Sequence, residues 1–174
     1  TEPGMVPDPL IHFVPADVLD PRSNGGLTLL YYTGLRRLAK NILADVVGSY
    51  LSRDRSAMRI LQELHVFPPV MAEAMSQKSI EPFGRLIDIA WGLKKGLDPE
   101  STTPVIEGIL ESVAGHIFGA TLLGAGGGGF LLLVCRSGAD AQDVRHILSQ
   151  DPPNARARFF DFDINQEGLV VTVS

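Results

Sequence analysis

The sequence of 174 residues contains a single cysteine, Cys135, which excludes an internal disulfide bond and any zinc site built from several cysteines. It also lacks an excess of positive charge, because 15 Lys and Arg residues stand against 20 Asp and Glu residues, a formal net charge of −5. Nucleic acids and anionic membranes are held largely by basic side chains. We therefore expect neither as a partner.

Long apolar segments are missing as well. The longest strictly apolar run, Phe130 to Cys135, is far shorter than the roughly 20 residues that a transmembrane helix needs. The first residues, Thr1 to Gly4, show neither the basic nor the apolar region of a secretory signal. We expect no membrane span and a cytoplasmic location.

What is present is the composition of one globular domain, with 45% hydrophobic and 20% charged residues. Residues 1–26 differ from the rest, because they carry five prolines and end in Asn24-Gly25-Gly26. Proline removes a backbone donor and disfavours helix. This composition predicts an extended connector over 1–26, followed by a folded domain over 27–174.

Within that domain the hydrophobic pattern predicts both strands and helices. The predicted strands are 27–33, 120–123 and 130–136, followed by a hairpin of period two over 160–173. The predicted helices are 35–50, a stretch over 55–77 in two pieces, 80–97, one that starts at Pro104 after a Thr103 cap and has an apolar stripe up to Ile117, and 138–150. Several antiparallel strands with segregated helices predict an α+β domain.

The most unusual segment is the glycine loop, Gly124-Ala125-Gly126-Gly127-Gly128-Gly129, which lies between two predicted strands. Glycine lets a ligand or another backbone approach closely, and successive free N–H groups can form an anion-binding concavity. The alternative is a flexible hairpin turn, for which so many glycines would be needlessly destabilising.

Gly124, Gly126 and Gly129 also satisfy the G-x-G-x-x-G pattern of dinucleotide-binding proteins. That fingerprint has to open a helix whose N-terminus meets the pyrophosphate. Here a predicted buried strand, 130–136, follows the loop instead. The context therefore excludes the dinucleotide fingerprint, and the absence of a following Gly-Lys-Ser/Thr excludes a P-loop.

Together with the glycine loop, the segment Tyr31-Tyr32-Thr33-Gly34, which enters a helix carrying Arg36 and Arg37, resembles the C-terminal half of GHMP-superfamily small-molecule kinases. The segments 88–99 and 158–163 are similar to the same superfamily. The likeness runs from about Leu27 to Ser174 and is nearest to the sugar-kinase branch that includes L-fucokinases, with heptose-phosphate kinases next. It implies a ferredoxin-like domain.

The resemblance implies a site divided between two domains. An N-terminal GHMP kinase domain would supply the phosphate loop and hold most of the ATP and Mg²⁺, and neither its phosphate loop nor its acidic residue occurs in these 174 residues. The loop from Gly124 through Ala125 to Gly129 would shape the site of the transferred phosphoryl group. Tyr32, Thr33 and Arg36 would lie near the domain interface and contact the sugar substrate.

Two functions remain open at this stage. The first is the C-terminal half of a kinase that phosphorylates the anomeric hydroxyl of a sugar such as L-fucose, with no catalytic residue in this chain and no activity on its own. The alternative is a non-catalytic small-molecule-binding or dimerisation domain of the same fold. A phosphate-loop motif upstream of Thr1 would favour the kinase.

The other polar candidates favour structural interpretations. The histidines are scattered without a partner at helical spacing, so we expect surface or core roles and no metal site; they are His12, His65, His116 and His146. Cys135 and Trp91 are expected in the core. Asp161 and Asp163 alternate with aromatic residues, which predicts a solvated strand face. For Arg36 and Arg37 two interpretations stay open: a solvated helix face, or contact with a phosphate or substrate oxyanion.

Overall fold

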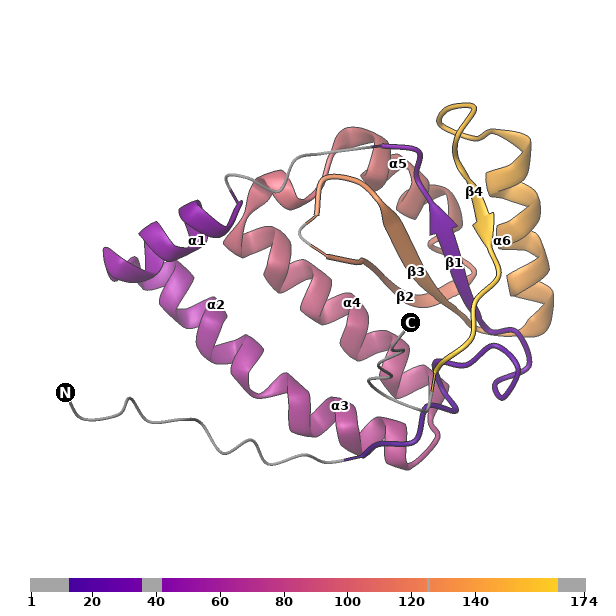
Figure 1. Cartoon of the computed structure of the whole chain (residues 1–174), viewed down its shortest axis with the longest axis horizontal. Coiled ribbons are helices and arrows are strands. Elements are labelled where there is room, and N and C mark those ends of the chain that lie inside the picture. Colours follow the sequence, from indigo (N-terminus) through magenta and orange to yellow (C-terminus); the bar gives the residue numbers. More distant parts are fainter. Residues whose placement is uncertain (1–12, 36–41, 125, 166–174) are drawn as a thin grey trace, which may run out of the picture.

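The computed structural model describes residues 13–35, 42–124 and 126–165, which form a four-stranded sheet with helices around it (Figure 1). The strands are β1 (Thr28–Tyr32), β2 (Ile117–Leu122), β3 (Phe130–Cys135) and β4 (Arg158–Phe160). The helices are α1 (Ile42–Leu51), α2 (Arg55–His65), α3 (Phe67–Ser76), α4 (Ile80–Leu97), the 3-10 turn η1 (Pro99–Ser101), α5 (Pro104–Val113) and α6 (Gly138–Gln150).

The sheet has the strand order β2-β3-β1-β4, and every neighbouring pair is antiparallel. Tyr31 in β1 lies opposite Leu131 in β3 and opposite Phe159 in β4. A helical crossover separates β1 from β2, and α6 separates β3 from β4. This β-α-β-β-α-β order confirms the predicted α+β class and its ferredoxin-like topology.

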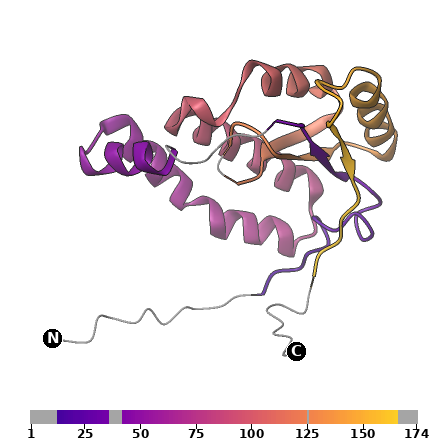
Figure 2. The same ribbon diagram turned by 45° about the horizontal axis from the view of Figure 1, so that its top comes forward.

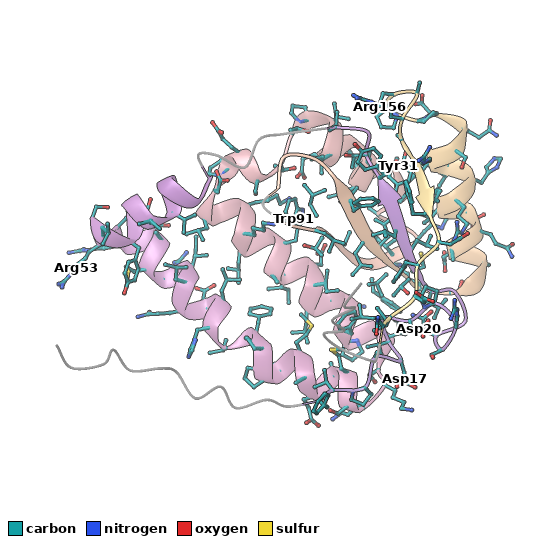
Figure 3. All side chains as sticks on the ribbon, in the orientation of Figure 1. Asp17, Asp20, Tyr31, Arg53, Trp91 and Arg156 are labelled. Atoms are coloured by element: carbon teal, nitrogen blue, oxygen red, sulfur yellow. The ribbon has the colours of Figure 1, made fainter. Side chains whose placement is uncertain are left out.

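Helices cover both faces of the sheet because successive side chains of a strand point to opposite sides. Leu131 and Leu133 belong to the core cluster that contains residues of α5 and α6. Leu132 and Val134 belong to a second cluster with residues of α3 and α4. Figure 2 shows α5 and α6 above the sheet and the α2–α3 pair below it. Tyr31 points from β1 toward α6 (Figure 3), where its hydroxyl donates to Leu148 O at 3.4 Å.

Helix α4 lies unusually close to β2. A Cβ added at Gly119 would overlap the carbonyl oxygen of Gly84 and would lie 2.7 Å from Asp88 Cβ. Gly119 is buried and follows an irregularity in the β2–β3 register, a position where glycine often permits close backbone approach. The contact between α4 and β2 therefore depends on the missing side chain.

Local signals predicted the helices well. The stretch 55–77 consists of two helices, α2 and α3, and the 80–97 and 138–150 helices match α4 and α6. Thr103 caps α5 as predicted, because its Oγ1 accepts from the N–H of Ile106 at 3.2 Å. The predicted 35–50 helix is seen from Ile42 onward, and residues 36–41 lie outside the described part of the chain.

Two predictions about element boundaries are wrong. Helix α5 ends at Val113, and Ile117 begins β2, so the earlier interpretation of Ile117 as the last residue of the helical stripe fails. Ile117 is buried in either element, and burial alone does not distinguish them. The first strand of the predicted 160–173 hairpin is also misplaced, because β4 covers Arg158–Phe160 and residues 161–165, including Asp161 and Asp163, lie outside any strand. Residues 166–174 lie outside the described residues.

The described part of the predicted connector, 13–26, is not extended. It forms turns over 17–19 and 21–25, and Val18 is buried in the second core cluster. Asn24 organises these turns, since its side chain donates to Val18 O and Thr28 Oγ1 and accepts from the N–H of Leu27, each at 2.9 Å. Asn and Asp side chains favour turns by such local hydrogen bonds. The segment therefore forms turns, although its proline content predicted an extended connector. The boundary at residue 26 stays a prediction.

None of the helices within 13–35, 42–124 and 126–165 is both long and apolar enough for a membrane span.

Candidate functional site

The glycine loop, 124–129, joins β2 to β3, and strand β3 follows it directly as predicted. Its backbone is anchored at the C-terminal end. Gly129 N–H donates to Leu35 O at 3.1 Å, and Gly129 O accepts from Thr33 N–H at 2.9 Å and from Thr33 Oγ1 at 3.0 Å. The segment that follows β1 therefore holds the end of the loop.

A second segment holds the beginning and middle of the loop. Gly127 N–H donates to Ser101 O in η1 at 2.6 Å, and Lys94 Nζ at the end of α4 donates to Gly124 O at 2.6 Å. A simple hairpin turn needs none of these contacts. They favour a positioned loop over the alternative of a flexible turn.

Two loop glycines are required by close backbone approach. A Cβ on Gly126, whose φ is +109°, would lie 2.7 Å from Ser101 O, and a Cβ on Gly128 would lie 2.8 Å from Leu35 O. The approaching groups are the protein's own backbone, one of the two possibilities that the sequence raised. Because Gly127 and Gly129 already donate to protein carbonyls, an anion would have to use other donors of the loop.

Tyr32 lies at the end of β1, next to the loop. Its ring centroid is 5.1 Å from that of Phe130, the residue after the loop, and 6.2 Å from that of Phe160. Phe130 and Phe160 are 5.2 Å apart, so the three rings form a half-buried aromatic cluster. Tyr32 thus retains exposed surface beside the predicted site.

Thr33, also predicted to contact substrate, is fully buried. Besides donating to Gly129 O, its Oγ1 accepts from Leu35 N–H at 3.3 Å. The observed contacts of Thr33 are thus with the chain around the glycine loop, and substrate contact stays a prediction. Two other predicted site residues, Arg36 and Ala125, lie outside the described residues.

Three residues that support the loop were not predicted from the sequence: Lys94, Ser101 and Asn154. Asn154 Nδ2 donates to Thr33 O at 2.8 Å and packs against Gly34. Asn154 lies just after the predicted 138–150 helix, and no role was predicted for it from the sequence. Lys94 lies in the 88–99 segment that carried the resemblance, but no spacing rule connects it to a loop about 30 residues away.

The remaining candidates lie away from the loop. His116 Nδ1 is 2.9 Å from Asp140 and 3.7 Å from Asp143, at the other end of β2. Ser137, the N-cap of α6, donates to Asp140 at 2.5 Å, and its Oγ accepts from Asp140 N–H. A carboxylate in the first turn also stabilises a helix N-terminus. These contacts cap the N-terminus of α6 and link it to His116, the residue directly before β2.

Cys135 and Trp91 occupy the core as predicted, at 0% and 2% exposure. Burial raises the pKa of the Cys135 thiol to about 12. A thiol with so high a pKa is not a nucleophile at neutral pH. Asp161 and Asp163 are exposed, and Asp163 pairs with Arg22 at 2.8 Å.

Comparison with known proteins agrees with this fold. Residues 71–154 match the family model of the GHMP kinases C terminal domain. The chain is 34% identical over all 174 residues to L-fucokinase/L-fucose-1-P guanylyltransferase of Bacteroides fragilis, and 30% identical over 122 residues to bifunctional fucokinase/GDP-fucose pyrophosphorylase of Arabidopsis thaliana. It spans 18% and 12% of their lengths.

Solved structures show the same fold. Mevalonate kinase of L. major superposes with a TM-score of 0.67 at 19% identity, over 77% of this chain and 41% of that one. Mevalonate kinase of Methanococcus jannaschii gives a TM-score of 0.57 at 26% identity, over 76% of this chain and 38% of that one. The chain contains a GHMP kinase C-terminal domain.

Proposed function

We propose that this chain is the C-terminal part of an ATP-dependent sugar kinase that phosphorylates the anomeric hydroxyl of a sugar such as L-fucose. The observation that carries the proposal is the 34% identity over the whole chain to a protein named for fucokinase and guanylyltransferase activities. Of those two activities the kinase is assigned, because the matching family model is one of kinases.

The anchored glycine loop supports this assignment. Phosphoryl transfer depends mostly on positioning and electrostatic stabilisation and needs little covalent chemistry from the protein. A loop held at Gly124, Gly127 and Gly129 is suited to positioning. We assign to it the shaping of the site around the transferred phosphoryl group, with Tyr32, Thr33 and Arg36 on the side of the sugar.

The described residues do not fit a Mg²⁺ site at the loop. Their close group of metal-ligating side chains, His116 with Asp140 and Asp143, lies at the start of β2, whereas the loop follows its end. Mg²⁺ is usually held by one or two carboxylates together with substrate phosphates. We therefore assign the metal and most ATP contacts to a separate phosphate-loop half of the enzyme and derive no step of the reaction through them.

The test is ADP release from ATP and Mg²⁺ with a panel of free sugars. It compares this 174-residue chain with the same chain joined to the phosphate-loop half that the resemblance predicts upstream. We expect turnover only in the joined protein and fastest with one sugar. Absence of turnover with every sugar would contradict the kinase and favour the non-catalytic binding or dimerisation domain.

Replacement of Gly126 by valine in the joined protein tests the loop. The added side chain would collide with Ser101 O, so we expect kcat to fall by about 100-fold or more, the cost of misplacing an active-site group by about 1 Å. The control is Gly92→Ala, because a Cβ there meets nothing within 4 Å. Equal activity of the two variants would contradict the role of the loop.

A further inference from the structure

The C-terminal turn of α4 contains two neighbouring lysines with different partners. Lys94 Nζ donates to Gly124 O at 2.6 Å and to Leu122 O at 3.3 Å. Lys95 Nζ instead pairs with the Glu107 carboxylate of α5, at 3.1 and 3.2 Å. Lys94 thus contacts the glycine loop and Lys95 contacts a helix on the other face of the sheet.

The two carbonyls that Lys94 binds need an outside donor. β2 is an edge strand of the sheet. Because Leu123 N–H donates to Phe130 O on β3, the backbone carbonyl of the neighbouring Leu122 points away from β3, toward the open edge. Gly124 O lies beyond the last residue of β2. An ammonium group has three donors and makes charge-assisted hydrogen bonds, which are about twice as strong as neutral ones.

The surroundings of Lys94 hold its ammonium in place. Trp91 (Figure 3), one turn earlier on α4, is buried. Its ring centroid lies 5.4 Å from Lys94 Nζ. Burial lowers the pKa of Lys94, while the nearby Asp98 carboxylate raises it. A cation at the C-terminal turn of a helix is also favoured by the helix dipole. These contacts restrict where the charge can lie.

The same stretch of chain contacts the loop a second time. Asp98 caps η1 by accepting from Glu100 N–H at 3.0 Å, and η1 presents Ser101 O to Gly127 N–H. Lys94 and Ser101 therefore fix two points of the loop that are three residues apart. Gly124 itself is exposed, and the Lys94 ammonium binds its carbonyl at the start of the loop.

We propose that Lys94 is a positioning residue for phosphoryl transfer, which acts by holding the Gly124 carbonyl at the start of the glycine loop. This inference rests on the proposed sugar-kinase function. In this role Lys94 acts on the reaction through the loop.

The first test is independent of kinase activity and uses hydrogen exchange of the loop amides in this chain. Lys94→Met removes the ammonium, and Lys95→Met is the matched control, because Lys95 lies 5.7 Å from the same Trp91 ring. We expect exchange of the Gly127 amide, three residues from Gly124, to accelerate by about tenfold or more in Lys94→Met only, since a charged hydrogen bond is lost. Equal exchange in the two variants would overturn the proposal.

The second test measures kinetics in the joined protein. We expect Lys94→Met to lower kcat by about 10- to 100-fold with the KM for sugar nearly unchanged, and Lys94→Arg to restore much of the rate because it keeps the charge. Activity of Lys94→Met equal to that of Lys95→Met would overturn the proposal. If the unsubstituted protein turns over no sugar, the proposed function fails, and the exchange experiment still decides whether Lys94 holds the loop.

Discussion

Replacement of Gly119 by alanine is expected to destabilise the chain, because this glycine allows α4 to lie against β2. The new Cβ would overlap Gly84 O and lie 2.7 Å from Asp88 Cβ, whereas carbon atoms pack at about 3.5–4.0 Å. Helix α4 would have to retreat by about 0.8 Å or more. No flexible side-chain end can move aside, since the overlapped atom belongs to the backbone.

The expected magnitude follows from two opposing effects. Overpacking a well-packed core lowers the free energy of unfolding by about 1–3 kcal/mol, and a radial gap of 0.5–1 Å forfeits about a quarter to a half of each dispersion contact. Alanine in place of glycine returns about 0.5–1 kcal/mol of backbone entropy. Because the clash is with backbone, we take the overpacking cost near its upper end, about 3 kcal/mol, so the expected net loss is about 2 kcal/mol.

Urea unfolding followed by tryptophan fluorescence measures this loss. Trp91 is the single tryptophan and is 2% exposed, so its emission reports on the core beside α4. With a slope of about 2 kcal/mol/M, a net loss of about 2 kcal/mol lowers the midpoint by about 1 M. The control is Gly92→Ala, in the exposed interior of α4, which is expected to raise the free energy of unfolding by about 0.5–1 kcal/mol.

An unchanged or higher midpoint for Gly119→Ala, with the same slope, would refute the reasoning, because it would mean that α4 is not pressed against β2 at this point. A fall of similar size in Gly92→Ala would refute it as well.

Two further predictions concern titrating groups. Because burial raises the pKa of Cys135 to about 12, the native chain should not react with a thiol reagent at pH 8, and should react in urea; rapid native labelling would contradict its burial. Hydrogen bonds from Ser137 and His116 lower the pKa of Asp140, so its stabilising contribution is present above the ordinary pKa of 3.8 and is lost as pH falls below it. The free energy of unfolding should therefore fall less between pH 6 and pH 3 in Asp140→Asn than in the unsubstituted chain, and an identical fall would contradict the link.

The elements that the sequence predicted correctly are those with local signals. Thr103 followed by Pro104 marks a helix start by residue type alone, and the 138–150 helix agrees at both ends. Ile117 was misassigned because a buried residue after a short turn fits a helix stripe and a strand equally well. The turns over 17–25 were missed because hydrogen bonds of the Asn24 side chain stabilise them. Hydrophobic periodicity does not predict such hydrogen bonds.

The glycine loop was found from its composition, but its supports were not. Lys94, Ser101 and Asn154 reach the loop or its neighbours from segments far away in the sequence. Which lysine ammonium meets which carbonyl depends on how α4 packs against β2. That packing geometry cannot be derived from the order of residues in the sequence. A substrate role for Thr33 followed from the resemblance, whereas its burial is visible only in the folded chain.

The order of strands has a consequence for synthesis on the ribosome. Strand β1 leaves the ribosome first, yet both of its partners in the sheet, β3 and β4, lie about 100 residues or more further along the chain. At about 5–20 residues per second, β1 waits for about 5–20 s before β3 is available. During that time the segment Thr28–Tyr32 exposes apolar side chains and unpaired backbone, so we expect the nascent chain to be most vulnerable to aggregation before the glycine loop is made.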